Sequence, residues 1–257
     1  MGMDGSSLWI RRYDTATPGA VRLICLPHAG GSASFFLPVS RALRPAIEVL
    51  AVQYPGRQDR RGEPCVDDIP LLARRIAQAL AGWTDRPFAL FGHSMGASVA
   101  FELARILEHE QGRTPAWLWA SGRRAPSRNR NERVHTLDDD HLIADLRRLS
   151  GTDDSILGDE EILRMILPAV RCDYRAAETY RWQPGPPLSC PVTALVGDDD
   201  QKVTEDEARA WGGHTCGPFD HRMFPGGHFY LVQHQPEILG LIRQRLTGTG
   251  RQPVVSS

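Results

Sequence analysis

Short apolar runs recur along the chain and are separated by longer segments in which apolar and polar residues mix. Four of the runs are Val21–Leu26, Glu48–Tyr54, Phe88–Phe91 and Trp117–Ser121. Their residues scarcely alternate between apolar and polar, which is typical of strands that are covered on both faces. These runs are therefore predicted to be buried strands.

The segments between the predicted strands fit helices. One helix is predicted over Ala33–Leu43, and a second runs to Trp83 from a cap at Asp67 or Asp68. A third follows the next strand and continues to about Glu110. Strands and helices that alternate with short connections predict a mostly parallel, doubly wound α/β sheet with right-handed crossovers.

The alternation stops over residues 123–187, where no strand pattern occurs. A helix is predicted over Leu137–Leu149, with Thr136 as its N-terminal cap. A second helix is predicted from about Asp159 to Tyr180, and Pro168 is expected to kink or split it. The sequence therefore predicts a helical insertion in the sheet.

The strand–helix alternation resumes after the insertion. The resumed elements are a strand at Val192–Val196, a helix at Glu205–Trp211, a strand at Arg222–Phe224 and a helix at Pro236–Leu246. Residues 1–122 and 188–257 are therefore expected to form the core. An insertion after the carboxyl end of a strand lies beside the place where such folds bind ligands. Residues 123–187 are accordingly predicted to be a lid.

Charge and hydropathy exclude several classes of protein. Thirty basic and 31 acidic residues give a net charge of −1, which excludes a general attraction to nucleic acid. No run of 18 apolar residues exists, so no membrane span is predicted. Met1–Tyr13 lacks the apolar stretch of a secretion signal. We expect a cytoplasmic protein with neither nucleic acid nor membrane as its partner.

The cysteines are few and scattered. They are Cys25, Cys65, Cys172, Cys190 and Cys216, and no two of them form a C-x-x-C pair. This spacing is typical neither of zinc sites nor of disulfide frameworks. The sequence therefore predicts reduced thiols, no metal site and no disulfide.

One pentapeptide has the form of a nucleophile elbow. Gly92-His93-Ser94-Met95-Gly96 follows a predicted strand and precedes a predicted helix, which is the context that this motif requires. The turn is so tight that the positions two before and two after the serine cannot carry side chains, and the helix N-terminus favours developing negative charge. Ser94 is the predicted nucleophile. The alternative is a glycine-rich turn with a capping serine.

A serine nucleophile needs a histidine base, and the base needs an acid that orients it. In this kind of fold the chain order is serine, acid, histidine. Of nine histidines, His228 is the predicted base because it lies in the glycine-containing loop Pro225–Phe229, before the last predicted helix. The acid is expected among Asp198, Asp199 and Asp200. Asp200 is preferred because it is furthest from the strand, and Asp199 is second.

The oxyanion of such a reaction needs two backbone N–H donors. One is expected from Met95, the residue after the nucleophile. The other is expected from the loop His28–Gly31, which follows the first predicted strand and is similar to the H-G-G-G element of this fold. Ala29 is the preferred donor and Gly30 is second.

Taken in order, several motifs resemble those of type II thioesterases of modular polyketide and nonribosomal peptide synthases, which are stand-alone α/β-hydrolases. The motifs are Leu26–Gly31, Tyr54–Arg57 with Arg60 and Glu63, Gly92–Ala97, Gly197–Asp200 and Gly226–Phe229. They extend from residue 26 to residue 229, most of the chain.

The resemblance implies that Ser94, Asp200 and His228 form a catalytic triad and that a helical lid covers an acyl channel. It also implies hydrolysis of aberrant or stalled acyl groups from the phosphopantetheine arm of acyl or peptidyl carrier proteins, through an acyl-serine. No cofactor is expected. The run Asp198-Asp199-Asp200 departs from the family pattern, because it leaves the position of the acid less defined.

Two features of the insertion bear on this reading. Its apolar residues are expected to hold it down and also to wall an acyl pocket. They are Ile143, Leu146, Leu149, Ile162, Met165, Ile166 and Leu167. Arg123–Arg133 contains five arginines, which are either a solvated loop or a docking patch for an acidic carrier protein. The five are Arg123, Arg124, Arg128, Arg130 and Arg133.

Three alternatives remain from the sequence. A general carboxylesterase or lipase would use the same three residues. A macrocyclising thioesterase is usually fused to the end of a synthase, whereas this sequence begins with Met1. A hydrolase-fold binding protein without activity is disfavoured because the predicted triad is intact.

Overall fold

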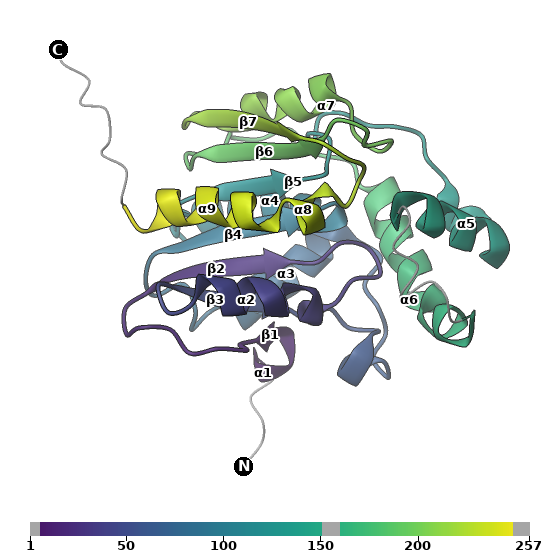
Figure 1. Ribbon diagram of the computed structural model, residues 1–257, viewed down its shortest axis with the longest axis horizontal. Helices are drawn as coiled ribbons and strands as arrows, with labels where there is room; N and C mark the ends of the chain where they lie inside the picture. Colours follow the sequence, from purple (N-terminus) through teal and green to yellow (C-terminus); the bar gives the residue numbers. More distant parts are fainter. Residues whose placement is uncertain (1–5, 151–159, 249–257) are drawn as a thin grey trace.

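The computed structural model describes residues 6–150 and 160–248 of the chain. Figure 1 shows one seven-stranded sheet with the strand order β1-β3-β2-β4-β5-β6-β7. Strand β1 pairs with β3 antiparallel, and the other neighbouring strands are parallel. The strands are β1 (Ile10–Arg11), β2 (Val21–Leu26), β3 (Ile47–Val52), β4 (Phe88–His93), β5 (Leu118–Ser121), β6 (Val192–Gly197) and β7 (Phe219–Phe224). The predicted mostly parallel sheet is therefore present.

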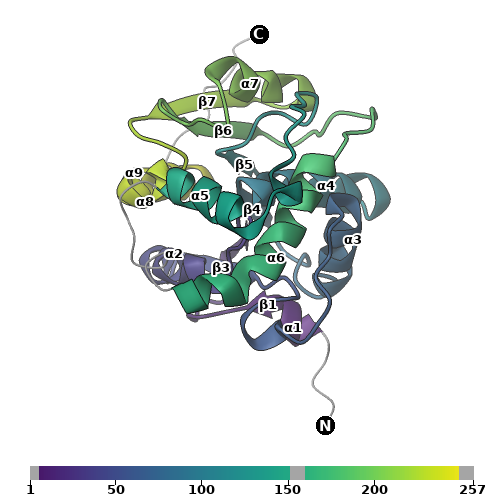
Figure 2. The same ribbon diagram turned by 90° about the vertical axis from the view of Figure 1, so that its right-hand side faces the viewer.

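Helices cover both faces of the sheet (Figures 1 and 2). Helices α2 (Leu37–Leu43), α8 (Tyr230–Gln233) and α9 (Gln235–Leu246) lie on one face. Helices α3 (Ile69–Ala79) and α4 (Met95–Arg105) lie on the other. Each face of the sheet therefore has its own apolar layer.

The two layers explain why the central strands do not alternate between apolar and polar residues. In β2, Leu23 and Cys25 pack into the layer that contains α2 and α9. Ile24 and Leu26 pack into the layer that contains α3 and α4. Because side chains of successive strand residues point to opposite faces, a strand between two covered faces must be apolar at nearly every position.

The register of the sheet brings several strand ends to one edge. Leu26 of β2 pairs with Gly92 of β4, and His93 pairs with Ser121 of β5. The last residue of β6 pairs with the last residue of β7. The loops that follow β2, β4, β6 and β7 therefore meet at the carboxyl edge of the sheet, where parallel α/β folds place their sites.

The insertion leaves the sheet after β5 and returns before β6. Its two helices, α5 (Asp139–Ser150) and α6 (Glu160–Thr179), lie beside the carboxyl ends of the strands (Figures 1 and 2). Six of their side chains form a small apolar cluster: Leu142, Ile143, Leu163, Leu167, Val170 and Tyr174. Ala176 at the end of α6, and Tyr180 directly after the helix, join the main core. This end of the insertion is therefore packed onto the core.

Several element boundaries differ from the sequence predictions. The cap of α5 is Asp138, whose Oδ1 accepts a hydrogen bond from the N–H of His141 at 2.9 Å. Thr136 is not the cap, because it belongs to a preceding 3₁₀ turn in which its hydroxyl donates to the carbonyl of Arg133. Helix α6 continues through Pro168 and is not split there.

Short and edge elements were the ones missed or shortened. Strand β7 is three residues longer than predicted. It is an edge strand and carries polar side chains such as Asp220, His221 and Arg222, so the sequence pattern did not reveal its first half. The remaining helical elements are short. They are α1 (Ser6–Trp9), α7 (Glu205–Arg209), 3₁₀ turns at Ala33–Phe36, Gln58–Arg60, Val134–Thr136 and Ala210–His214, and a π turn at Ile106–Glu110.

The expectation that all cysteines are reduced is wrong for two of them. Cys65 and Cys172 form a disulfide that joins the loop after β3 to helix α6. The two residues are 107 positions apart, so no local spacing pattern could predict the pair. Cys25, Cys190 and Cys216 are free. The disulfide adds a covalent link between the insertion and the core.

No helix within the two described ranges is both long enough and apolar enough to cross a membrane.

Candidate active site

Ser94 lies in the turn between β4 and α4, and its backbone has φ 55° and ψ −121°. This is a region that side-chain-bearing residues rarely occupy. A Cβ on Gly92 would lie 2.2 Å from the carbonyl oxygen of Gly96. A Cβ on Gly96 would lie 2.1 Å from that of Leu26. Both glycines are required by the turn, as the sequence motif predicted.

The three residues of the predicted triad are joined by hydrogen bonds. Ser94 Oγ lies 3.0 Å from His228 Nε2. On the other side of the ring, His228 Nδ1 lies 3.0 and 2.9 Å from the two carboxylate oxygens of Asp200. The serine follows β4, the aspartate follows β6 and the histidine follows β7. Together they form the arrangement in which a base accepts the serine proton and a carboxylate orients the base.

The three adjacent aspartates have different partners. Asp198 Oδ1 accepts a hydrogen bond from the N–H of Gly226 at 2.8 Å, in the loop that carries the histidine. Asp199 is exposed, and its Oδ1 accepts from the side-chain amide of Gln201 at 3.1 Å. Asp200 is buried against the histidine. The geometry therefore places the third aspartate in the position of the acid.

The loop after β2 packs directly against the elbow. A Cβ on Gly96 would lie 2.6 Å from the carbonyl oxygen of Pro27. Within this loop, the N–H of Gly31 donates to the carbonyl of His28 at 2.9 Å. The N–H of Gly30 donates to a carboxylate of α6 at 2.7 Å. Of the two predicted donors in this loop, Gly30 is therefore engaged elsewhere, which favours Ala29.

Two neutral histidine rings lie near His228. The ring of His93 lies 5.0 Å from that of His228, and the ring of His28 lies 5.9 Å from that of His93. Burial, followed by the charge that His228 carries when protonated, lowers the pKa of His28 to about 3 and holds the pKa of His93 well below its usual value. Both rings are therefore neutral at neutral pH. Sequence reasoning assigned them no role, although both lie within the quoted motifs.

A buried chain of hydrogen bonds runs behind these rings. His93 Nδ1 lies 3.0 Å from Ser121 Oγ, and Ser121 Oγ lies 2.6 Å from the hydroxyl of Tyr230. All three side chains are at most 2% exposed. The chain fixes the ring of His93 beside His228.

The apolar residues of the insertion pack mainly against one another. Ile143 and Leu167 are buried, and Leu146, Leu149 and Ile166 are partly buried in the same cluster. Ala29 packs against this cluster, so its apolar face reaches the loop after β2. Met165 is 67% exposed and does not belong to the cluster. The side chain of Ile162 lies outside the described part.

The arginine run is mostly structural. Arg123 donates to the carbonyl of Ala177 at 2.9 Å, and Arg124 is buried in an ion pair with Glu132. Arg130 makes two bonds to Glu207, at 2.8 and 2.6 Å. Protein groups take up N–H donors of all three side chains, so these arginines do not form a simple solvated loop, and the buried Arg124 is not available for docking. Arg130 is 31% exposed, and its docking role stays a prediction.

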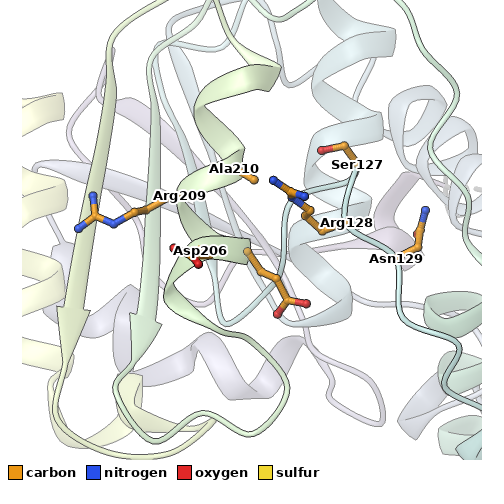
Figure 3. A pocket seen from close by; sticks show the side chains of 7 residues that line it. Ser127, Arg128, Asn129, Asp206, Arg209 and Ala210 are labelled. Carbon is orange, nitrogen blue, oxygen red and sulfur yellow. The ribbon is translucent and has the colours of Figure 1, made fainter.

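Arg128 and Arg133 are the exposed arginines of the run, and Arg128 borders a surface depression. Arg128 and its neighbours line an open cavity of about 680 Å³ where the loop meets α7 (Figure 3). Its lining residues are Ser127, Arg128, Asn129, Asp206, Glu207, Arg209 and Ala210. Charges of both signs line it and no triad residue does, so it is neither a cationic patch nor part of the site at Ser94.

The fold and the site together define a class. A strained serine on a strand–helix elbow, bonded to a histidine and a carboxylate from later strand ends, is the site of an α/β-type serine hydrolase. The thioesterase domain family matches residues 21–246. The chain belongs to this family and is a thioester hydrolase with the α/β-hydrolase fold.

Individual relatives agree with the assignment. Thioesterase PikA5 from Streptomyces venezuelae is 53% identical over 249 residues, which cover 96% of this chain and 89% of that protein. The structure of the type II thioesterase BorB from the borrelidin biosynthetic cluster has a TM-score of 0.90 and 56% identity, covering 93% of this chain and 98% of that chain. The RedJ thioesterase of the prodiginine pathway of Streptomyces coelicolor has a TM-score of 0.84 and 38% identity, covering 90% and 89%.

Proposed function

We propose that this thioesterase removes aberrant or stalled acyl groups from the phosphopantetheine arm of acyl or peptidyl carrier proteins of a polyketide or nonribosomal peptide synthase. The observation that carries the proposal is the hydrogen-bonded set Ser94, His228 and Asp200 at the carboxyl edge of the sheet. The similarity to type II thioesterases of biosynthetic clusters supports the class of substrate.

In the proposed reaction, His228 Nε2 takes the hydroxyl proton of Ser94 as Oγ attacks the thioester carbonyl carbon. The carbon–sulfur bond then breaks, and the thiol of the carrier arm leaves with the proton that the imidazole held. Water, deprotonated by the same imidazole, attacks the acyl-serine and releases a carboxylic acid. Asp200 orients the ring through Nδ1 and stabilises its protonated form.

The oxyanion of each tetrahedral intermediate is proposed to accept hydrogen bonds from the N–H groups of Met95 and Ala29. Met95 is the first residue of α4, so its N–H lies at a helix N-terminus, where the backbone dipoles favour negative charge. Ala29 lies in the loop that touches the elbow. No metal or redox cofactor takes part in the proposed steps.

Residues 123–187 are proposed to act as a lid whose apolar cluster walls the acyl channel, while residues 1–122 and 188–257 form the catalytic core. The support is that the cluster of α5 and α6 reaches Ala29, the residue beside the proposed oxyanion. The same cluster would desolvate the acyl chain as it passes.

We also propose that the protein acts in the cytoplasm, where its carrier substrates would be made. The bond between Cys65 and Cys172 stands against this location, because disulfides are rare in that compartment. Counting thiols in protein unfolded without a reductant tests the point. Five reactive thiols would place both residues in the reduced state, and three would retain the bond.

The substrate class is tested by comparing an acyl-carrier thioester with an oxygen ester that bears the same acyl group. The proposal expects a much higher kcat/KM for the carrier thioester. Equal or better hydrolysis of the oxygen ester would instead favour the general carboxylesterase. Ser94→Ala provides the control, because it removes the nucleophile and should leave only the residual rate that the oxyanion donors provide.

A further inference from the structure

A buried ion pair joins the insertion to the core beside the active site. Arg57, in the loop after β3, donates to the two carboxylate oxygens of Asp173 in α6 at 2.6 and 2.8 Å. The side chain of Arg57 is 7% exposed and that of Asp173 is 1% exposed. Taking two charges out of water is costly, so a buried pair is by itself weak evidence for stability. Its remaining contacts show what the pair holds.

Within its own loop, the guanidinium donates to the carbonyl of Pro55 at 3.3 Å. The two other contacts are to the loop after β2. The carboxylate of Asp173 also accepts the N–H of Gly30 at 2.7 Å. The guanidinium of Arg57 also donates to the carbonyl of Gly31 at 3.1 Å. The pair therefore binds two successive residues of this loop: Asp173 accepts the N–H of Gly30, and Arg57 donates to the carbonyl of Gly31.

The same loop is pressed closely against α6. Gly30 has a φ of 75°, and a Cβ at this position would lie 2.8 Å from a methyl group of Val170, one turn before Asp173. Only a glycine permits this approach and this backbone conformation together. The position of the loop is therefore set by the face of α6 that carries Asp173.

The grip on Gly30 and Gly31 determines the direction of one further N–H. The N–H of Gly31 donates to the carbonyl of His28 at 2.9 Å. That carbonyl shares a planar trans peptide with the N–H of Ala29, so the two groups point in opposite directions. Fixing the carbonyl toward Gly31 therefore aims the Ala29 N–H away from the turn. The bond from the N–H of Gly30 to Asp173 fixes the next peptide plane, which joins Ala29 to Gly30.

We propose that Asp173, held by Arg57, is a positioning residue that orients the N–H of Ala29 for the oxyanion. The inference rests on the proposed role of Ala29 as an oxyanion donor. It gives the insertion a part in the chemistry besides covering the acyl group. The oxyanion loop is in its active geometry only while α6 is docked on the core.

Asp173→Asn is the sharpest variant. The carboxylate accepts from three donors, namely two N–H groups of Arg57 and the N–H of Gly30. An amide of the same size has only one acceptor oxygen, and its NH₂ group would face one of these donors. The NH₂ group then opposes either the N–H of Gly30 or the guanidinium that donates to the carbonyl of Gly31, so one of the two contacts with the loop is weakened while the volume of the side chain is kept.

Glu178→Gln is the matched control. Glu178 lies in the same helix, is 6% exposed and accepts backbone N–H bonds from Val134 and His135 at 3.0 Å each. These partners lie in the insertion, so the change removes a buried charge of α6 without touching the loop after β2. It reports what a comparable structural loss does to activity.

Four quantities are measured for each variant: kcat and KM on a small N-acetylcysteamine thioester, the affinity for a trifluoromethyl ketone that forms a tetrahedral adduct, and the thermal midpoint. Removing one oxyanion donor lowers kcat about 100- to 1000-fold, so misdirecting it in Asp173→Asn is expected to lower kcat about 10- to 100-fold. The affinity for the ketone should fall by a similar factor, with KM within about threefold of the wild type. Glu178→Gln should keep kcat.

A folded Asp173→Asn protein with kcat within about threefold of the wild type would overturn the proposal. So would equal losses in both variants that follow the folded fraction. If Asp173→Asn does not fold, Arg57→Lys decides, because it keeps the charge but loses the two-point grip. It should lower kcat at constant KM, and an unchanged kcat would also overturn the proposal. Activity that survives Ser94→Ala would refute the proposed function instead, whatever Asp173 does.

Discussion

Asp200→Asn tests the acid and the orientation of the base at once. In the structure, Asp200 Oδ1 accepts the N–H of Lys202 at 2.8 Å as well as facing His228 Nδ1. In the variant, the Lys202 N–H retains the amide oxygen at that position. The NH₂ group must then take the place of Oδ2, which lies 2.9 Å from Nδ1.

At this contact the NH₂ group and an Nδ1–H would be two donors facing each other, which disfavours the tautomer with the proton on Nδ1 although the amide oxygen stays 3.0 Å from that nitrogen. We expect the imidazole to move its proton from Nδ1 to Nε2. The proton then faces Ser94, and the base has no lone pair with which to accept the serine proton. The loss expected from such a tautomer change is about 10⁴-fold in kcat, or about 5.4 kcal/mol of transition-state stabilisation at 1.36 kcal/mol per tenfold.

The assay is kcat on a small acyl thioester, with the thermal midpoint measured in parallel. Asp199→Asn and Asp198→Asn are the controls. Asp199 is exposed, and Asn at position 198 still offers an oxygen to the N–H of Gly226, so both should stay within about tenfold of the wild type. If Asp199→Asn were the crippled variant, or if Asp200→Asn kept a tenth of the activity, the assignment of the acid would be wrong.

Three further predictions concern stability. Arg124→Gln should lower the free energy of unfolding by about 1 to 3 kcal/mol, because it breaks the ion pair between a buried guanidinium and the partly buried Glu132. Arg128→Gln should change it by less than about 0.5 kcal/mol in denaturant titrations. Gly96→Ala should lower the free energy of unfolding by about 3 kcal/mol or more, because the added carbon meets backbone atoms and not a movable side chain. The same change should abolish fluorophosphonate labelling of the protein. Normal labelling would contradict the elbow geometry. Burial, followed by the charge of Arg105, lowers the pKa of His214 to about 4, so the unfolded state binds the proton first. The stabilisation present above pH 6.5 should therefore be lost as the pH falls towards 4, and the pH dependence of the thermal midpoint should be flatter in His214→Asn.

The sequence was most informative where burial and backbone geometry leave few choices. Strands covered on both faces must be apolar throughout, so Val21–Leu26 and Phe88–Phe91 were located to within two residues. The elbow could also be located from the sequence, because only glycine fits the turn at positions 92 and 96. Asp200 was preferred by its distance from the strand, and its carboxylate oxygens lie 3.0 and 2.9 Å from His228 Nδ1.

What the sequence left open depends on contacts between distant segments. The edge strand β7 carries polar residues, so its first half showed no strand pattern. The arginines at 124 and 130 resembled a solvated charge run, because their acidic partners could not be paired with them from spacing alone. The bond between Cys65 and Cys172, and the contact of Asp173 with Gly30, required the placement of α6 on the core. The catalytic roles of Ser94 and its partners stay predictions until the variants are measured.

The positive φ of Ser94 means that the protein trades stability for reactivity at this residue. A side chain in this region of backbone space costs about 1 to 3 kcal/mol, and a glycine there would relieve the strain. Natural variation that improved folding alone would therefore drift toward glycine at position 94 and lose the nucleophile. Only selection for turnover keeps a serine at this turn, so a relative that had become a pure binding protein would be expected to lose this residue early.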